Sequence, residues 1–389
     1  MGSYAYKYVC AKCIVDEALG RIVSINASSE KCTYCGGQPA ADLGIVTEHI
    51  AECIAGVYTD PVEVLPWETR EGGWQGGTVY NLWEIFEEVE LFIEDEQLRL
   101  DITDYFDQTE WCVRDWQILG PSKRKASGWR SFKKAVKHKR RYTFWSMGDE
   151  TGEDEWHPDY CAVGKTLDEI TASIRDTGLI KQIQLGTPIW RVRIHKNKDK
   201  LIKDSDFTSP PIEKAIQSNR MSPAGVPMLY GAEDFDTAYQ ETVDPGRIKG
   251  KIITGGCFKT TTPLHVLDLV DIPEVPSFFN KEAADISDDL IFLRNFVDEL
   301  SEPIERDGRE HIEYVPTQVF TEYVRWQMKI NDGQPIDGIR YRSSKNGKSC
   351  YVLFCEQDEC VDEPRFAVER RWLNFDLTSL TSRCSPDKE

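Results

Sequence analysis

Apolar residues recur along the chain at two different spacings, and the change of spacing predicts where helices and strands lie. Apolar residues at positions 82, 85, 86, 89 and 92 follow the helical period, which predicts an amphipathic helix over 82–92. Apolar and polar residues alternate over 187–194, which predicts a half-buried strand. The β-type runs at 228–230 and 349–355 predict two more strands. Together these patterns predict an α+β chain whose helical part precedes its strands.

The same patterns, with local composition, divide the chain into three predicted domains. Residues 1–40 carry paired cysteines, residues 41–165 have helical patterns, and residues 180–365 mix strands with short helices. An acidic helical insertion is predicted at about 271–310, opened by Pro273 and Pro276. The residues after Leu380 are expected to be frayed.

Two pairs of cysteines near the start of the chain predict a metal site. Cys10 and Cys13 form one C-x-x-C pair, Cys32 and Cys35 form the other, and eighteen residues separate the pairs. This spacing is typical of structural zinc, which four thiolates surround completely. Residues 21–25 are predicted to form a strand of this zinc ribbon. Because such a site leaves no position for water, a zinc hydrolase is disfavoured.

The remaining cysteines and the hydropathy of the chain limit its class. The chain has 12 cysteines in 389 residues, which favours thiols and metal ligands over a disulfide framework. Cys350, Cys355 and Cys360 are spaced too widely for a metal knuckle and are expected in the core. No apolar run reaches the length of about 20 residues that spans a membrane, and no signal peptide is evident. We therefore expect no membrane partner and a cytoplasmic location.

Charge is distributed unevenly along the chain. The net charge of -19 argues against a nucleic-acid partner, since nucleic-acid binders usually present a basic face. The predicted helical domain is polarised, because acids dominate residues 83–110 and bases dominate residues 121–142. We interpret these runs as helices that lie near each other or on opposite faces, in preference to an RNA-binding surface.

Several polar residues of the C-terminal region lie at the ends of predicted strands or on a helix border. Arg191 and Arg193 share one strand face, where they either pair with distant carboxylates or hold an anion. Glu241 borders the apolar stripe of a helix that Asp234 or Asp236 caps. Ser343 and Ser344 precede an Asn-Gly hairpin. Each residue taken alone has an ordinary structural explanation.

The order of these residues along the chain, together with the motifs around them, resembles a known family. The motifs are Trp190-Arg191, then Arg220-x-x-Pro223-x-Gly225-x-Pro227-x-Leu229-Tyr230, then Thr237-Ala238-x-x-Glu241, then Asp337-Gly338-Ile339-x-Tyr341-x-Ser343. This string resembles the RES family, named for an arginine, a glutamate and a serine, over about residues 180–360. By motif position these residues are Arg191, Glu241 and Ser343, with Ser344 as the alternative serine. Met221 and Ser222 stand where the family more usually has Trp and Asn.

The region before it resembles the HEPN-like N-terminal domain that is found fused to RES domains. The resemblance rests on Gly128-Trp129-Arg130-Ser131-Phe132, on Val136-Lys137-His138 and on Arg141-Tyr142-Thr143-Phe144. Active HEPN ribonucleases use an Arg and a His four to six residues apart, whereas seven residues separate Arg130 from His138. We therefore expect an association or regulatory module, with ribonuclease activity as a rival hypothesis.

The RES resemblance implies a fold similar to ADP-ribosyltransferases and cleavage of the nicotinamide–ribose bond of NAD. It implies Arg191 and Arg220 for the pyrophosphate, Glu241 for the developing positive charge, Tyr230 for the nicotinamide ring and Ser343 for substrate orientation. Arg193 and Ser344 are further candidates for contact with NAD.

The implied protein is an NAD glycohydrolase or phosphorylase that acts as a toxin or defence effector. Water, phosphate and a protein side chain all stay open as acceptors, and the last of these would make it an ADP-ribosyltransferase. A non-catalytic scaffold that binds a nucleotide or a protein is another alternative. An antitoxin or defence partner and a homodimer are expected from the resemblance alone.

Overall fold

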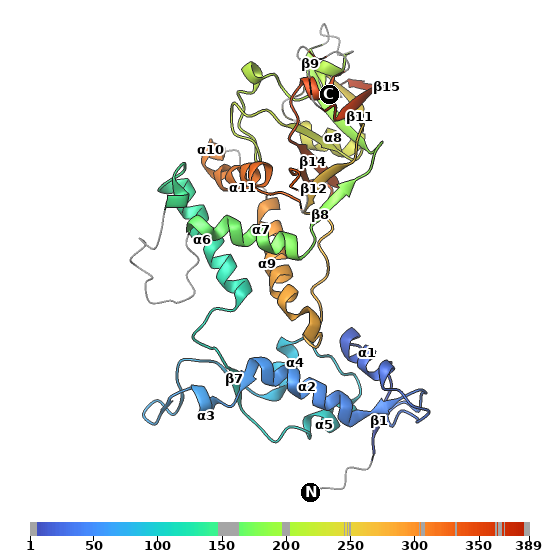
Figure 1. The fold of residues 1–389 in the computed structure, drawn as a ribbon, viewed down its shortest axis with the longest axis vertical. Coiled ribbons are helices and arrows are strands. Elements are labelled where there is room, and N and C mark those ends of the chain that lie inside the picture. Colours follow the sequence, from blue (N-terminus) through green and yellow to red (C-terminus); the bar gives the residue numbers. More distant parts are fainter. Residues whose placement is uncertain are drawn as a thin grey trace. The chain divides into compact units, whose positions relative to one another are not determined.

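The chain forms two compact units (Figure 1). The computed structural model describes residues 6–146, 163–196, 203–244, 246, 248, 250–302, 304, 308–330, 333–361, 364, 368 and 370–384. Of these residues, the first unit takes those of 1–123 and 274–289. The second unit takes the described residues from Arg124 onwards, apart from 274–289. The boundary between the second and third predicted domains, at 165–180, therefore does not coincide with the division into units.

The first unit combines helices with small sheets. Its helices are α1 (Glu17–Ile25), α2 (Leu43–Val57), α3 (Pro61–Val64), α4 (Leu82–Glu88) and α5 (Glu96–Thr103). Its strands are β1 (Tyr8–Val9), β2 (Ala41–Asp42), β3 (Tyr58–Thr59), β4 (Trp67–Glu68), β5 (Gly73–Trp74), β6 (Val79–Tyr80) and β7 (Trp111–Val113). Apolar side chains of α1, α2, α4 and α5 share one core, which Phe279 joins from the returning segment 274–289.

The predicted strand at residues 21–25 is wrong, because these residues belong to α1. Asp16 caps this helix by accepting a hydrogen bond from the backbone N–H of Leu19 at 2.9 Å. Leu19 and Val23, four residues apart, are buried on one side of it. A run of five residues is too short to distinguish the strand period from the helical one.

The predicted helix at 82–92 forms, but it ends as α4 at Glu88. Glu90 adopts a left-handed conformation with φ of 56°, and the N–H of Leu91 reaches back to the carbonyl of Phe86 at 2.8 Å. This pattern is that of a Schellman C-cap. Phe92, which the helical period had placed on the apolar face, is therefore exposed.

The second unit is built on a mixed sheet, which confirms the predicted α+β class. Its strands are β8 (Ile180–Ile183), β9 (Pro188–Lys196), β10 (Leu229–Ala232), β11 (Lys251–Thr260), β12 (Leu264–Asp268), β13 (Gly338–Arg342), β14 (Ser349–Leu353) and β15 (Leu373–Cys384). Across the described residues they form one sheet in the order β15-β11-β9-β10-β14-β13-β12-β8. Strands β12 and β13 are parallel, and the other neighbouring pairs are antiparallel.

Strand β15 lies at the edge of this sheet, where it pairs with β11. It runs to Cys384, so the prediction that residues after Leu380 are frayed is wrong for 381–384. The partners of this strand lie more than 100 residues earlier in the chain. A strand of this kind is stabilised by non-local pairing, which the local sequence does not reveal.

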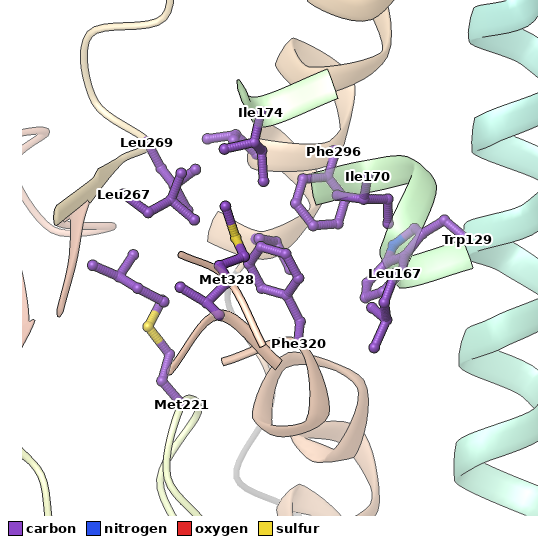
Figure 2. Packing of buried hydrophobic residues seen from close by; sticks show 14 of the residues in the cluster. Trp129, Leu167, Ile170, Ile174, Met221, Leu267, Leu269, Phe296, Phe320 and Met328 are labelled. Atoms are coloured by element: carbon purple, nitrogen blue, oxygen red, sulfur yellow. The ribbon is translucent and has the colours of Figure 1, made fainter. Parts of the chain in front are cut away.

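The second unit also contains the helices α6 (Pro121–His138), α7 (Thr166–Asp176), α8 (Phe235–Thr242), α9 (Ala284–Ser301), α10 (Glu310–Glu313) and α11 (Val315–Trp326). Helices α6, α7, α9 and α11, like helix α8, pack against the face of the sheet that carries Ala232, Cys350 and Val352. Helices α6, α7, α9 and α11 gather beside the β8 and β12 end of the sheet (Figure 1). Their apolar side chains share one core with Leu267, Ile339 and Val352 of the sheet. Figure 2 shows Trp129 of α6, Ile170 of α7, Phe296 of α9 and Phe320 of α11 in this core.

The basic residues of α6 find their partners within the second unit. Lys133 pairs with Glu299 of α9, and Lys137 pairs with Glu313 of α10 at 2.5 Å. The acidic helices α4 and α5 belong to the first unit. The partners of Lys133 and Lys137 are thus acids of α9 and α10, and the predicted relation between the basic run and residues 83–110 stays a prediction. In the described part of the chain, no helix has the length and apolar character that crossing a membrane requires.

Candidate functional site

The four paired cysteines come together in the first unit. Cys10 and Cys13 lie just after β1, and Cys32 and Cys35 lie in the turn before β2. Their sulfur atoms all lie within 4.8 Å of one another, with Cys10–Cys35 at 3.4 Å and Cys13–Cys32 at 3.8 Å. A tetrahedral zinc ion with Zn–S bonds of about 2.3 Å places its sulfurs about 3.8 Å apart. The group is therefore able to hold a metal ion.

The turn around Cys35 is shaped by close backbone approach. The N–H of Gly37 points at the sulfur of Cys35, 3.4 Å away. A Cβ atom at Gly37 would stand 3.3 Å from that sulfur and 3.8 Å from the sulfur of Cys10. Glycine at this position leaves the sulfurs room to converge. Tyr34, between the two cysteines, donates a hydrogen bond to Asp101 of α5 at 2.7 Å, which fixes the turn to the helices of the unit.

A large cavity lies in the second unit, between α8, the strands β9, β10 and β13, and the loop before β10. Its volume is about 840 Å³. Among the described residues that line it, Glu241 is the one acid, and the cations are Arg191, Arg193, Lys214, Arg220, Arg342 and Lys345. Aromatic side chains of Trp190, Tyr230, Tyr314 and Tyr341 complete much of the wall. A cavity of this size with a strong positive potential suits an anionic ligand of nucleotide size.

Helix α8 carries Glu241 to this cavity. Asp234 caps the helix by accepting a hydrogen bond from the N–H of Thr237 at 2.7 Å. Thr237 and Ala238 are buried, whereas Glu241 is exposed to the cavity. Gly255 of β11 allows the helix to approach the sheet closely, because a Cβ atom at this position would lie 2.3 Å from the ring of Phe235. The helix therefore lies close against the sheet with its last turn at the cavity.

The hairpin between β13 and β14 holds the other side of α8. Ser343, directly after β13, donates a hydrogen bond from its hydroxyl to Oε1 of Glu241. Asn346 donates to Thr237 at 3.0 Å, and Lys348 pairs with Asp234 at 2.6 Å. Ser343 is buried, while Ser344 is exposed and lines the cavity. Three contacts from one hairpin thus set the position of the helix that carries Glu241.

Tyr230 of β10 lines the cavity and is tied to the loop before its own strand. Its hydroxyl and that of Ser222 are 2.9 Å apart. Burial raises the pKa of Tyr230 to about 12, although Ser222 opposes the shift, so the phenol is neutral at physiological pH. The loop is held in turn by the buried amide of Gln318, which donates to Ser218 and to the carbonyl of Asn219. Tyr230 therefore presents a fixed, neutral ring to the cavity.

Arg191 and Arg193 reach the cavity from the face of β9 opposite α8. Trp190 and Val192, at the alternate positions, pack against α8. Arg191 donates to the carbonyl of Tyr230 at 3.0 Å, where β9 and β10 share a single register pair. Arg193 donates to the carbonyls of Asp206 and Thr208. Both guanidinium groups are therefore partly engaged by the backbone.

Burial has a strong electrostatic effect on both arginines. It lowers the pKa of Arg191, with a further contribution from the charge of Arg193, and it lowers the pKa of Arg193 to about 10. In the described part of the chain the buried Nε of Arg191 has no hydrogen-bond acceptor. A buried, incompletely paired guanidinium is costly, and an anion in the cavity would lower that cost.

Arg220 lies on the loop before β10, and its guanidinium is bound to the end of α9. It donates to the carbonyl of Leu300 and, at 2.6 Å, to that of Glu302. The last carbonyls of a helix lack intrahelical partners and carry partial negative charge, so a cation is stabilising there. The side chain still forms part of the cavity wall. Its position is consequently set by α9 as well as by its own loop.

The sequence interpretation missed several residues of the cavity wall. Trp190, Tyr341 and Cys350 all lie on sheet positions that face the α8 side, and Lys214, Arg342 and Lys345 add positive charge. Tyr341 could have been found from its alternation with Ser343 at two residues' distance. Burial raises its pKa well above the usual range, as it raises that of Cys350 to about 12. Lys214 follows no such pattern, because it ends a single 3-10 turn, Ile212–Lys214, which is too short to show a period.

The three cysteines predicted for the core, Cys350, Cys355 and Cys360, are buried, as predicted. Arg130 and His138 are both exposed on α6, eight positions apart, which is about 12 Å along a helix axis.

Two family models match the chain. A model described as HEPN/RES N-terminal domain 1 matches residues 25–150, and a model described as RES domain matches residues 188–376. The first covers Cys32 and Cys35 and extends through α6, and the second covers every predicted residue of the cavity. No curated protein and no solved structure was found to match.

Proposed function

Because this chain is a RES domain protein that carries a HEPN/RES N-terminal domain, we propose that it binds NAD in the cavity beside α8 and cleaves the nicotinamide–ribose bond. The observation that carries the proposal is the hydrogen-bonded pair Ser343 and Glu241. It brings the one carboxylate among the described lining residues into a cavity whose other charges are positive.

The chemistry fits this balance of charges. The bond between C1′ of the ribose and the nicotinamide nitrogen breaks, and its electron pair leaves with the ring, which becomes neutral. The ribose then carries positive charge shared between C1′ and its ring oxygen, as in glycoside hydrolysis. No general acid is needed because the leaving group is already cationic. A single carboxylate near C1′ stabilises the transition state more than the ground state, because positive charge builds up on C1′ and the ring oxygen as the bond breaks.

Each residue predicted for the site has a role in this proposal. Arg191 and Arg220, with Arg193 behind them, supply the positive potential that holds the pyrophosphate. Glu241 faces the ribose, oriented by Ser343, with Ser344 as a further hydrogen-bonding group at the mouth. Tyr230, neutral and fixed, packs against the nicotinamide ring, whose positive charge favours an aromatic neighbour.

The molecule that accepts the ADP-ribosyl group determines the class of enzyme. With water, a proton is lost from the attacking oxygen and ADP-ribose is formed. With phosphate, the product is ADP-ribose 1-phosphate, and with a protein side chain it is an ADP-ribosylated protein. Loss of cellular NAD would arrest growth, so the proposed biological role is that of a toxin or defence effector. Such an enzyme requires a partner, for example an antitoxin, that restrains it.

For the four cysteines we propose a structural zinc ion. Cys10, Cys13, Cys32 and Cys35 would hold it, and the ion would supply a cross-link between β1, the turn before β2 and the start of α1. A site of four thiolates offers no coordination position for water, so it takes no part in NAD cleavage.

The proposal is tested by incubating the full chain with NAD and measuring free nicotinamide by chromatography. Mass analysis of the second product, with and without added phosphate, separates hydrolysis, phosphorolysis and protein modification. NAD that binds without nicotinamide release would support the alternative of a non-catalytic nucleotide-binding protein.

A further inference from the structure

Helix α6 is part of the core of the second unit, although the model of the N-terminal domain extends over it. That model covers residues 25–150, whereas the compact second unit begins at Arg124. The ring of Trp129 packs edge-on against Phe296 of α9, with ring centroids 5.0 Å apart (Figure 2). Trp129 and Phe132 are fully buried in the core that contains Leu167, Phe296 and Phe320.

One carboxylate connects α6 to the end of α9. Oε1 of Glu299 accepts a hydrogen bond from Nε1 of Trp129 at 3.0 Å and another from the ammonium group of Lys133. Glu299 lies in the last turn of α9, which ends at Ser301. These contacts fix the position of the last turn of α9 relative to α6.

The same turn holds Arg220. The carbonyls of Leu300 and Glu302, directly after Glu299 and one residue beyond the helix, accept from the Arg220 guanidinium. A second cavity of about 350 Å³ is lined by Trp129, Lys133 and Glu299, among others. Arg220 is common to the walls of both cavities.

The main chain at Arg220 is anchored separately. Its carbonyl accepts from the hydroxyl of Thr317 at 2.5 Å, and the next residue, Met221, is buried in the same core as Trp129 (Figure 2). The backbone of Arg220 is therefore fixed by α11, while its guanidinium follows the end of α9.

We infer that Glu299 is a positioning residue, which transmits the placement of α6 through the end of α9 to the Arg220 guanidinium and so sets how tightly the cavity binds a dianionic dinucleotide. The ligand in this inference rests on the proposed function, whereas the coupling of Glu299 to Arg220 does not. The segment matched as N-terminal domain then contributes to the proposed NAD site indirectly, through Glu299 and Arg220.

The test uses full-length variants. Glu299→Ala removes both contacts with α6, and we expect the KM for NAD to rise about three- to tenfold with kcat within about twofold, because Glu241 and Ser343 are untouched. Glu299→Gln keeps an oxygen that can accept from Trp129, so it should restore most of the affinity. Glu169→Gln is the matched control, since it breaks the 3.8 Å pair between Arg124 of α6 and Glu169 of α7. It should leave the KM unchanged.

A double-mutant comparison separates positioning from general loosening. In an Arg220→Ala background, Glu299→Ala should raise the KM no further, because its effect passes through the missing guanidinium. A KM that rises by the same factor in both backgrounds would overturn the inference.

Hydrogen exchange supplies a measurement that needs no catalysis. The amide of Glu302 is bonded to the carbonyl of Glu299, in the turn whose carbonyls hold the Arg220 guanidinium. We expect its exchange to be faster in Glu299→Ala than in wild type and unchanged in Glu169→Gln. If the wild type releases no nicotinamide, the proposed function fails while this exchange still decides the inference, and unchanged exchange in Glu299→Ala would overturn it.

Discussion

The hydroxyl of Ser343 donates its hydrogen bond to the carboxylate of Glu241, which joins the end of β13 to the last turn of α8. The serine also accepts from the backbone N–H of Lys345 at 3.1 Å, so its orientation is fixed by its own turn. A carboxylate held in this way keeps one oxygen engaged and leaves the other for the ligand.

Substitution of the two adjacent serines should give unequal effects. Ser343→Ala removes a charge-assisted hydrogen bond, worth about 1.5–3 kcal/mol, so we expect kcat/KM for NAD to fall about ten- to hundredfold. Ser344→Ala should change it by less than about threefold, because in the described part of the chain no side-chain hydrogen bond involves Ser344. Steady-state nicotinamide release measures both. A larger loss in Ser344→Ala would assign the functional serine to that position instead.

The cap of α8 should give the second unit a specific dependence on acid. Burial opposes ionisation of Asp234, but its bonds with Lys348 and Thr237 outweigh burial and lower its pKa. The folded pKa is therefore below the unfolded value of about 3.9, so the stabilisation is fully present above that value. It is lost as the pH falls through the lowered folded pKa.

Two substitutions separate the cap from the charge of Asp234. Asp234→Asn keeps a capping oxygen but lacks the charge, so its free energy of unfolding should vary less with pH below about pH 5 than that of wild type. Asp234→Ala should lose about 1 kcal/mol more at neutral pH, since the cap is lost as well. Urea unfolding at a series of pH values measures this. Equal slopes for wild type and Asp234→Asn would contradict the assigned pair with Lys348.

The cysteine cluster should bind one zinc ion per chain without contributing to NAD cleavage. Cys32→Ser should lose the metal and lower the melting temperature of the first unit, as measured by metal analysis and calorimetry. Cys53→Ser, at a buried thiol outside the cluster, is the control and should keep the metal. Nicotinamide release should persist in both, because the described residues of the cavity all belong to the second unit. Its loss in Cys32→Ser alone would contradict a purely structural metal.

The positive cavity predicts that ligand binding depends on salt. Binding of ADP-ribose, measured by calorimetry, should weaken several-fold between low and physiological ionic strength, because cations at the mouth, Lys214 and Lys345, are exposed and screened. Binding of uncharged adenosine is the control and should hardly change. ADP-ribose binding that does not respond to salt would place the pyrophosphate outside this cavity.

Local pattern sufficed for the elements that position the site. The alternation around Trp190 and Arg191 predicted β9, and Asn346-Gly347 predicted the hairpin, where Gly347 has a positive φ of 74°. Motif order pointed to Glu241 and Ser343, two residues that lie about 100 positions apart and are hydrogen-bonded in the structure. Each of these signals is local or lies in a short motif, which a sequence displays directly.

The sequence did not predict which residues far apart in the chain contact one another. The charge pattern marked α6 as a basic helix, but nothing local indicates that Lys133 meets Glu299, 166 residues later. The alternation of β9 placed Arg191 and Arg193 on one face, yet it could not show that α8 covers the opposite face. The same limit explains the error at residues 21–25, where a few apolar residues fit both periods and the Asp16 cap decides for a helix.

The most direct test of the account compares nicotinamide release by the wild type, Glu241→Gln and Glu233→Gln. Glu233 lies just before α8 and is absent from the described lining of the cavity, so it controls for loss of a nearby carboxylate. We predict release by the wild type and by Glu233→Gln, with a loss of about a hundredfold or more in Glu241→Gln. Nicotinamide release that survives Glu241→Gln undiminished would contradict the assigned role of this carboxylate.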